Sequence, residues 1–270
     1  MIEDTLETDD READGAPKFS ENYIARMLKE YGNLYYPYAH LNETLYLNHK
    51  GFCRIMNMHM FPDLKCLHIQ CNGKYVCFDF MIGLRSMLGL EQNMKLRTLI
   101  LCENAISRMT GLETLVSLAN LNLSNNMISE ITGLSNCVKL EVLNLSHNNL
   151  GRQSNDIADS VGSLKGLLEC PSIHTLDVMA NYLEDPEILP EVLGKMADLS
   201  VFECKENNFS SKIVNFRKRM IASIPNLCHL NGMPVFENER RTTIAWLNGN
   251  KEGEVAERQK IRDEEEAARK

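Results

Sequence analysis

The stretch NLNLSNNMISEITGL, residues 120–134, and the segment VLNLSHNNL, residues 142–150, follow one pattern. In both, two leucines at alternate positions precede an asparagine, so the shared core is L-x-L-x-x-N. From Asn104 to Asn126 and on to Asn148, the asparagine recurs every 22 residues. Successive side chains of a strand point to opposite faces. The pattern therefore predicts short strands that bury their leucines and expose the residue between them.

The same pattern extends over most of the chain. The asparagine stands at Asn72, Asn104, Asn126, Asn148, Asn181 and Asn207. An earlier repeat has Leu45 and Leu47 but Lys50 in place of the asparagine, and a final half-repeat has Leu227 and Leu230. About seven repeats of this type predict an α/β leucine-rich-repeat solenoid, in which neighbouring repeats cover each other's core. The asparagine ladder is expected to bind backbone groups that the turns would otherwise bury without partners.

The flanking segments predict caps for the two ends of the solenoid. Ser20 has the chemistry of a helix N-cap and precedes apolar residues at helical spacing. Lysine, arginine and glutamate alternate near the end of the chain, which favours a solvated helix over a coiled coil. The predicted organisation is a disordered acidic N-terminus (1–19), an N-terminal helical cap (20–40), leucine-rich repeats (41–210), a C-terminal cap (211–248) and a charged helix (249–270).

Two steps of the ladder are longer than 22 residues. Between Asn148 and Asn181, the extra sequence predicts a helix on the convex side that begins near Ser154. Between Asn72 and Asn104, residues 84–96 resume a normal repeat if residues 74–83 are left out. These ten residues are either a genuine loop on the ridge or a short in-frame intron translated in the gene model.

Composition excludes several classes of protein. The net charge of −8 argues against a protein that coats nucleic acid. No apolar run approaches the roughly 20 residues that span a bilayer, and the acidic beginning lacks the apolar core of a secretory signal. We therefore expect an intracellular protein without membrane insertion, whose nine cysteines are reduced thiols.

No motif for catalysis, phosphate binding or zinc binding is present, and we expect no enzyme activity, metal or cofactor. Cys66, His68 and Cys71 lie close together, but a fourth ligand is missing and the spacing fits no zinc site. Asp177 and Glu203 are expected on adjacent strands, as an acidic pair without a nucleophile or base. Six other cysteines fall among apolar or strand positions, and most of these six are expected in or near the core: Cys53, Cys102, Cys137, Cys170, Cys204 and Cys228.

One large surface remains, the concave face of the sheet. Exposed tyrosine, isoleucine and methionine there point away from the core and suit partner binding, although repeat proteins also tolerate scattered apolar surface residues. The candidate binding residues are Tyr46, Asn48, His68, Gln70, Ile100, Asn122, Asn144, Asp177, Met179 and Glu203. A basic segment with Lys212, Arg217, Lys218 and Arg219 either docks an acidic partner, such as a tubulin tail, or forms the charged outer face of a capping helix, which is commoner.

Residues 20–268 resemble the leucine-rich-repeat dynein axonemal assembly factor family of motile cilia. The repeats are shared with many proteins, whereas LYLNHKGF (45–52) and IASIPNLCHLNGMPVF (221–236), followed by AW (245–246), are more selective. The insert at 74–83 departs from the family's pattern.

The resemblance implies a non-enzymatic scaffold for the cytoplasmic preassembly of axonemal dynein arms. It also implies a cytoplasmic and ciliary or flagellar location, with axonemal dynein subunits, chaperones or other assembly factors as protein partners. Two alternatives remain open from the sequence: a stable axonemal or microtubule-associated structural protein, and a regulatory subunit of a phosphatase.

Overall fold

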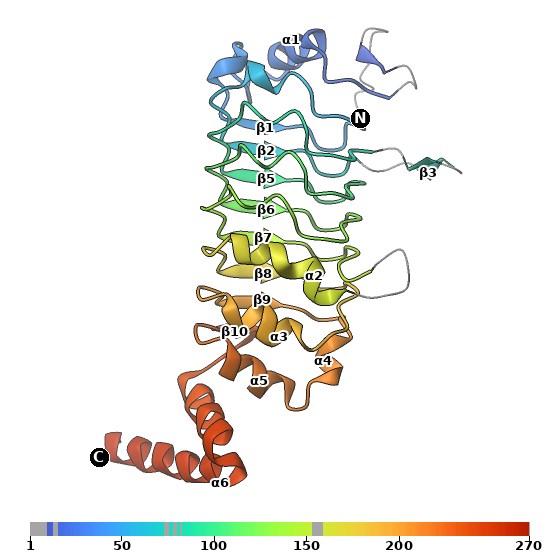
Figure 1. Cartoon of the computed structure of the whole chain (residues 1–270). Coiled ribbons are helices and arrows are strands. Elements are labelled where there is room, and N and C mark those ends of the chain that lie inside the picture. The colour runs from blue at the N-terminus through green and yellow to red at the C-terminus, as the bar shows by residue number, and fades with distance from the viewer. Residues whose placement is uncertain are drawn as a thin grey trace.

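The computed structural model describes residues 10–12, 16–72, 76–77, 80–81, 83–152 and 159–269. The chain winds into stacked coils, one per repeat, with helical caps at both ends (Figure 1). The predicted α/β leucine-rich-repeat solenoid is confirmed. One parallel strand belongs to each repeat: β1 (Thr44–Tyr46), β2 (Cys66–His68), β5 (Thr98–Ile100), β6 (Asn120–Asn122), β7 (Val142–Asn144), β8 (Thr175–Asp177) and β9 (Val201–Glu203).

These strands form one sheet in chain order, which β10 (His229–Leu230) and β11 (Met233–Pro234) complete at the C-terminal end. The register is the same at every step, because the middle residue of each strand lies opposite the middle residue of the next. The aligned residues are Leu45, Leu67, Leu99, Leu121, Leu143, Leu176 and Phe202. All seven are buried. Their neighbours in each strand therefore point to the opposite, concave side.

The core runs continuously from the N-terminal cap to the last repeat. Three of the six cysteines predicted for it are buried, namely Cys137, Cys170 and Cys204. Burial raises the pKa of these thiols to about 11, about 12 and about 12, since the thiolate is the form that loses most hydration. Cys53 and Cys102 are half-buried and Cys228 is exposed, so most of the six lie in or near the core, as predicted. Cys228 directly follows the buried Leu227, so its side chain faces away from the core.

Short helices cover the convex side of the later repeats (Figure 1). They are α2 (Ser160–Leu164), η4 (Lys165–Glu169), α3 (Ile188–Glu191) and η5 (Leu193–Lys195), while η3 (Met58–Met60) belongs to an early repeat. The long step after Asn148 does contain a helix, but α2 begins at Ser160 and not near Ser154. Asp159 is its N-cap, and its carboxylate accepts a hydrogen bond from Gly162 N at 2.6 Å. Ser154 itself lies outside the described residues.

The N-terminal cap consists of α1 (Glu21–Glu30) and η2 (Ala39–Leu41). Ser20 is the N-cap of α1, as predicted, and accepts from Tyr23 N at 2.9 Å. The hydroxyl of Tyr35 accepts from Tyr46 N at 3.1 Å and donates to Tyr46 O at 3.4 Å. This phenol occupies the free edge of β1, where a further strand would otherwise pair.

Part of the segment predicted to be disordered belongs to this cap. Within residues 1–19, the structure describes residues 10–12 and 16–19, and Asp10 and Phe19 contact residues of α1, contrary to the predicted disorder. Asp10 is fully buried and binds Arg26 at 2.6 Å, and the ring of Phe19 meets the ring of Phe52 edge-on. A buried carboxylate with a cationic partner and an aromatic contact together hold this segment in place.

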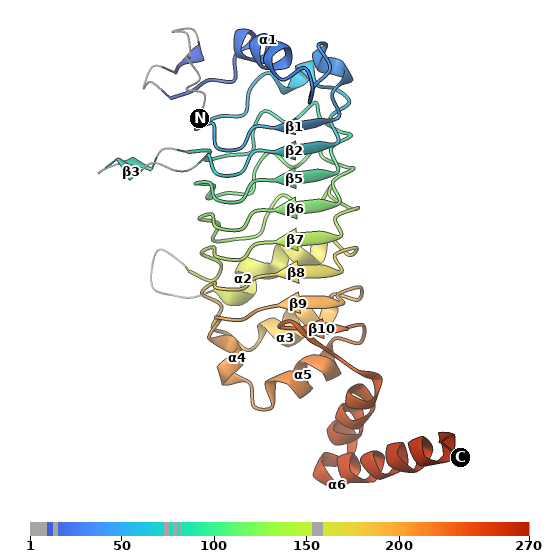
Figure 2. The same cartoon turned by 180° about the vertical axis from the view of Figure 1, so that it is seen from behind.

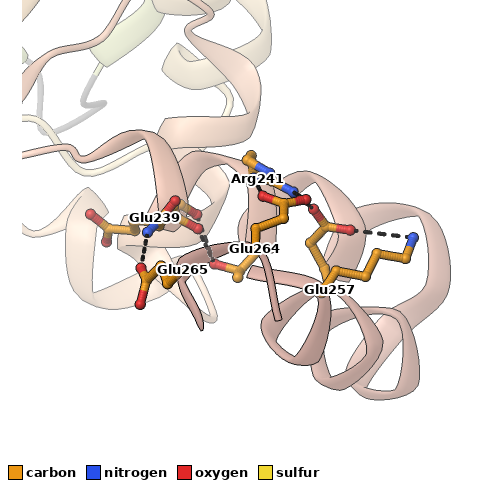
Figure 3. A network of polar contacts seen from close by, with 8 residues as sticks. Glu239, Arg241, Glu257, Glu264 and Glu265 are labelled. Carbon is orange, nitrogen blue, oxygen red and sulfur yellow. Dashed lines mark hydrogen bonds and ion pairs between the residues drawn. The ribbon is translucent and has the colours of Figure 1, made fainter. Parts of the chain in front are cut away.

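The C-terminal cap contains α4 (Phe209–Lys212), α5 (Phe216–Ser223) and α6 (Glu237–Ala268). Helix α6 begins inside the predicted cap and bends at Gly249 and Asn250, so it has two arms. The second arm is the predicted charged helix. It is largely exposed, but it also contacts the first arm, where Arg241 binds Glu257 at 2.7 Å and Glu264 at 2.6 Å (Figure 3). No helix in the described ranges combines the length and hydrophobicity that crossing a membrane requires.

The insert between Asn72 and Asn104 contains a β-hairpin in its described part. β3 (Val76–Cys77) pairs antiparallel with β4 (Phe80–Met81) in a separate two-stranded sheet. It projects from the side of the stack, and β2 and β5 pair directly despite the insertion (Figures 1 and 2). The repeat geometry is therefore continuous past residues 74–83.

Candidate functional site on the concave face

The concave face carries a row of side chains, one from each strand, which we call the concave row (Figure 2 shows the strand side of the solenoid). Each member is the last residue of its strand and lies opposite the next member in the sheet register. The row runs Tyr46, His68, Ile100, Asn122, Asn144, Asp177 and Glu203. All seven are half-buried or exposed, so the sheet presents them to solvent.

The N-terminal end of the row is aromatic and apolar. The rings of Tyr46 and His68 stack with their centroids 4.7 Å apart, and Tyr46 is 43% exposed. Burial lowers the pKa of His68, because the imidazolium loses hydration at this position. The imidazole is therefore neutral at physiological pH and, with the half-buried Ile100 next to it, forms an uncharged surface.

The middle of the row is polar and has fixed side-chain orientations. The carbonyl oxygen of Asn122 accepts from Ser124 N at 3.0 Å. Asn144 repeats this geometry on the next strand, where its carbonyl oxygen accepts from Ser146 N at 2.9 Å. Such local hydrogen bonds to the backbone fix the side-chain rotamer. Each amide NH2 group therefore faces away from the backbone and is oriented before any partner arrives.

The C-terminal end of the row is acidic. One carboxylate oxygen of Asp177 accepts from Met179 N at 2.9 Å, which is the same local geometry as in the two asparagines. One carboxylate oxygen of Glu203 accepts from Gly232 N at 2.6 Å. The two residues lie directly opposite each other on β8 and β9. They are therefore the adjacent acidic pair that the sequence predicts, with a second oxygen on each carboxylate still able to accept.

Three predicted residues lie beside the row and not in it. Asn48, Gln70 and Met179 each stand two positions after a member of the row, and all three are half-buried. The side-chain oxygen of Gln70 is buried without a hydrogen-bond partner among the described residues. These residues form a second line at the ends of the strands.

The asparagine ladder joins consecutive repeats through their backbones. Asn126 is representative: its amide donates to Leu101 O at 3.0 Å in the preceding repeat and to Leu123 O at 3.0 Å in its own. Its carbonyl oxygen accepts from Ile106 N at 3.0 Å. Corresponding bonds to backbone carbonyls are made by Asn72, Asn104, Asn148, Asn181 and Asn207. These residues therefore serve structure, and they are separate from the concave face.

The basic segment binds partners within the chain itself. Arg217 binds Glu239 at 2.6 Å, Lys218 binds Glu254 at 2.5 Å, and Lys212 binds Glu184 at 3.3 Å. Arg219 lies over the ring of Trp246, with its guanidinium carbon 5.7 Å from the ring centroid. The hydrogen bond from Lys218, helped by Arg258, lowers the pKa of Glu254. This segment therefore holds the C-terminal cap together.

The structure does not bring Cys66, His68 and Cys71 together as one metal site. In the ranges that it describes, no group of three or more histidine, cysteine, aspartate or glutamate residues is placed to hold a metal ion. Cys66 and His68 share the concave side of β2, whereas Cys71 is buried beyond the strand.

Sequence reasoning missed a group of exposed tyrosines and leucines near the N-terminal end of the row. The segment that follows α1 exposes Tyr31, Leu34, Tyr36, Tyr38 and Leu41. Tyr35 in the same segment holds the backbone of Tyr46. The density of tyrosine in YGNLYYPYAHL, residues 31–41, was the available signal, since globular surfaces rarely expose so many large apolar residues together.

The sequence is similar to a protein named for leucine-rich repeats and to proteins named dynein axonemal assembly factor 1. "Leucine-rich repeat-containing protein ODA7" of Chlamydomonas reinhardtii is 43% identical over 107 residues, which are 40% of this chain and 24% of that protein. "Dynein axonemal assembly factor 1" of Mus musculus is 38% identical over 254 residues, 94% of this chain and 37% of that protein. A homolog in Drosophila erecta is 36% identical over 82% of this chain and 14% of its own length. The chain thus spans between about a seventh and somewhat over a third of these relatives. No family model matches the sequence.

Solved structures support the fold alone. An internalin C2 from Listeria monocytogenes aligns with a TM-score of 0.52 at 20% identity, over 69% of each chain. The structure of a TLR13–ssRNA13 complex aligns with a TM-score of 0.53 at 17% identity, over 75% of this chain and 27% of that one.

Proposed function

We propose that the chain takes part in assembling axonemal dynein arms, because its sequence is similar to proteins named dynein axonemal assembly factor 1. In this proposal it acts in the cytoplasm, without catalysis, as a scaffold that binds dynein subunits, chaperones or other assembly factors. The similarity over 94% of the chain to the mouse protein carries the proposal. The concave face supports it, because a rigid sheet with an exposed Tyr46 and a half-buried Ile100 suits the binding of unfinished protein surfaces.

The test places charges on the concave face and asks whether dynein arms still form. The variant Ile100→Glu with Met179→Lys changes two half-buried side chains that lie outside the core. We expect it to fold, and to fail in rescuing ciliated cells that lack the native protein. Their cilia should be present and immotile, with dynein arms missing in cross-section.

A matched control carries the same charges on another surface. Val116→Glu with Val138→Lys alters exposed apolar residues in the turns before β6 and β7, and it should restore the arms. Normal arms in cells that express the folded concave variant would refute the role of the concave face. Normal arms in cells without the protein would refute the assembly role.

Cell fractionation distinguishes the structural alternative. An assembly factor should leave with the detergent extract, whereas a structural component of the axoneme should remain with the detergent-resistant pellet. The phosphatase alternative requires phosphatase activity that copurifies with the chain.

A further inference from the structure

The concave row changes its chemistry steadily from one end of the solenoid to the other. The aromatic stack of Tyr46 and His68 is followed by Ile100, then by two amides, and finally by the carboxylates of Asp177 and Glu203. We propose that this row binds an extended segment of a partner protein that carries an apolar side chain at one end and a lysine or arginine at the other. The proposal rests on the assembly role above and names the chemistry of the partner.

The amides in the middle favour an extended occupant. Because the carbonyl oxygens of Asn122 and Asn144 already accept backbone hydrogen bonds, their NH2 groups are the atoms left for a ligand. In the described part of the chain these NH2 groups have no hydrogen-bond partner. They would bind carbonyl oxygens, and an extended segment offers unpaired backbone carbonyls, whereas a helix uses most of its own.

The acidic end favours a cationic side chain. Asp177 and Glu203 each use one oxygen within the fold, and neither forms an ion pair among the described residues. Lys205 stands two positions after Glu203 and is exposed, yet it makes no ion pair in that part of the chain. The two carboxylates therefore have no ion-pair partner among the described residues, and a guanidinium or ammonium group of a ligand would bind them with charge-assisted hydrogen bonds.

The strand spacing fixes the length of the segment. Strands of a sheet lie about 4.8 Å apart, so Ile100 on β5 and Glu203 on β9 are separated by about 19 Å. An extended chain advances about 3.3 Å per residue, so the apolar and the basic residue of the segment should be roughly six positions apart.

The experiment uses the purified chain and a displayed library of random 12-residue peptides. We expect enrichment of peptides in which an apolar or aromatic residue and a lysine or arginine are about six positions apart. Asp177→Asn with Glu203→Gln should lower the affinity for the selected peptides about tenfold or more. Both substitutions keep the acceptor oxygens that bind Met179 N and Gly232 N, so folding should be unaffected.

The control removes the same charge elsewhere. Glu103→Gln with Glu206→Gln neutralises two exposed carboxylates in the turns beyond the strands, and it should leave peptide affinity within about twofold of the native value. The proposal is overturned if no peptide is selected, if enriched peptides lack a basic residue, or if both double variants weaken binding equally. Peptide selection uses the purified chain and does not depend on cilia. A wrong assembly role would show in the rescue experiment, whereas a wrong assignment of the concave row would show in the peptide selection.

Discussion

At the scale of single residues, the ladder asparagines link each repeat to the one before it. Asn126→Leu removes donors to Leu101 O and Leu123 O and an acceptor for Ile106 N, all of them buried. We expect the free energy of unfolding to fall by about 1–3 kcal/mol, because the abandoned backbone groups find no other partner. Chemical denaturation followed by circular dichroism measures this loss.

The control for this substitution lies on the concave side of β6. Asn120→Val exchanges a half-buried side chain for the residue that β7 already has at the equivalent position, Val142. Its effect on stability should stay within about 0.5 kcal/mol. Equal losses in the two variants would show that the ladder asparagine has no special structural role.

A second residue-scale feature is a left-handed backbone conformation before the ladder position of every repeat. The residues are His49, Cys71, Glu103, Asn125, His147, Ala180 and Glu206, with φ between 52° and 58°. Such a conformation is unfavourable for residues other than glycine, asparagine and aspartate. The sequence could not predict it, because the residue types at this position share no chemistry. The asparagine one position later was predictable, because a single residue type recurs there.

Replacing Ala180 tests this backbone strain. Ala180→Gly should raise the free energy of unfolding by about 0.5–1 kcal/mol, since glycine adopts a φ of 52° without steric cost. Ala119→Gly, at a residue without positive φ, should instead lower it by a similar amount. The melting temperatures of the two variants should shift in opposite directions. A lower melting temperature for Ala180→Gly would contradict the claim that the backbone of Ala180 is strained.

At the scale of elements, helix starts were predictable only where one capping residue stands alone. Ser20 fits the N-cap of α1 and has no close competitor, and the prediction was right. Before α2, both Ser154 and Asp159 have the chemistry of an N-cap, and the local sequence does not distinguish them. The contact between the arms of α6 was also beyond prediction, because Arg241 binds Glu257 and Glu264 from a distant part of the helix (Figure 3).

The bend of α6 depends on the close approach of its two arms. A side chain at Gly253 would place its Cβ 2.5 Å from Ala245 O, whereas a Cβ at Gly249 would meet no atom within 4 Å. We expect Gly253→Ala to separate the arms and Gly249→Ala to be tolerated, since Gly249 has a negative φ of −129°. Limited trypsin digestion should cleave Gly253→Ala faster at Lys251 than the native chain. Equal cleavage rates for the native chain and both variants would show that the arms do not need this contact.

At the scale of the whole molecule, the repeat period predicted the solenoid fold, its strands and its buried leucines, but it predicted nothing about the insert. Buried leucines recur because each coil must cover the core of its neighbours, so the spacing of the leucines predicts the length and the stacking of the repeats. Residues 74–83 have no period, and the sequence left open whether they belong to the protein. In the structure, the strands on both sides of them pair in the common register, with Leu67 opposite Leu99.

Deleting residues 74–83 should therefore leave the solenoid intact. The deletion joins Gly73 to Leu84 and restores the sequence Asn-x-Leu that other repeats show, as at Asn148 and Leu150. Leu84 is already fully buried, in line with Ile106 and Ile128. Loop length affects stability only slowly, at about 0.6 kcal/mol per doubling, so the melting temperature should change by less than about 4 °C.

A deletion of equal length within a regular repeat provides the contrast. Removing residues 106–115 takes out Ile106, Met109, Leu112 and Leu115, all fully buried. Losing even one such side chain costs about 2–5 kcal/mol, so this variant should lose its cooperative transition in circular dichroism. If deletion of 74–83 were equally damaging, the insert would be an integral part of its repeat. A neutral result would show that the 22-residue coil is complete without it, as both the ridge-loop and the translated-intron interpretations require.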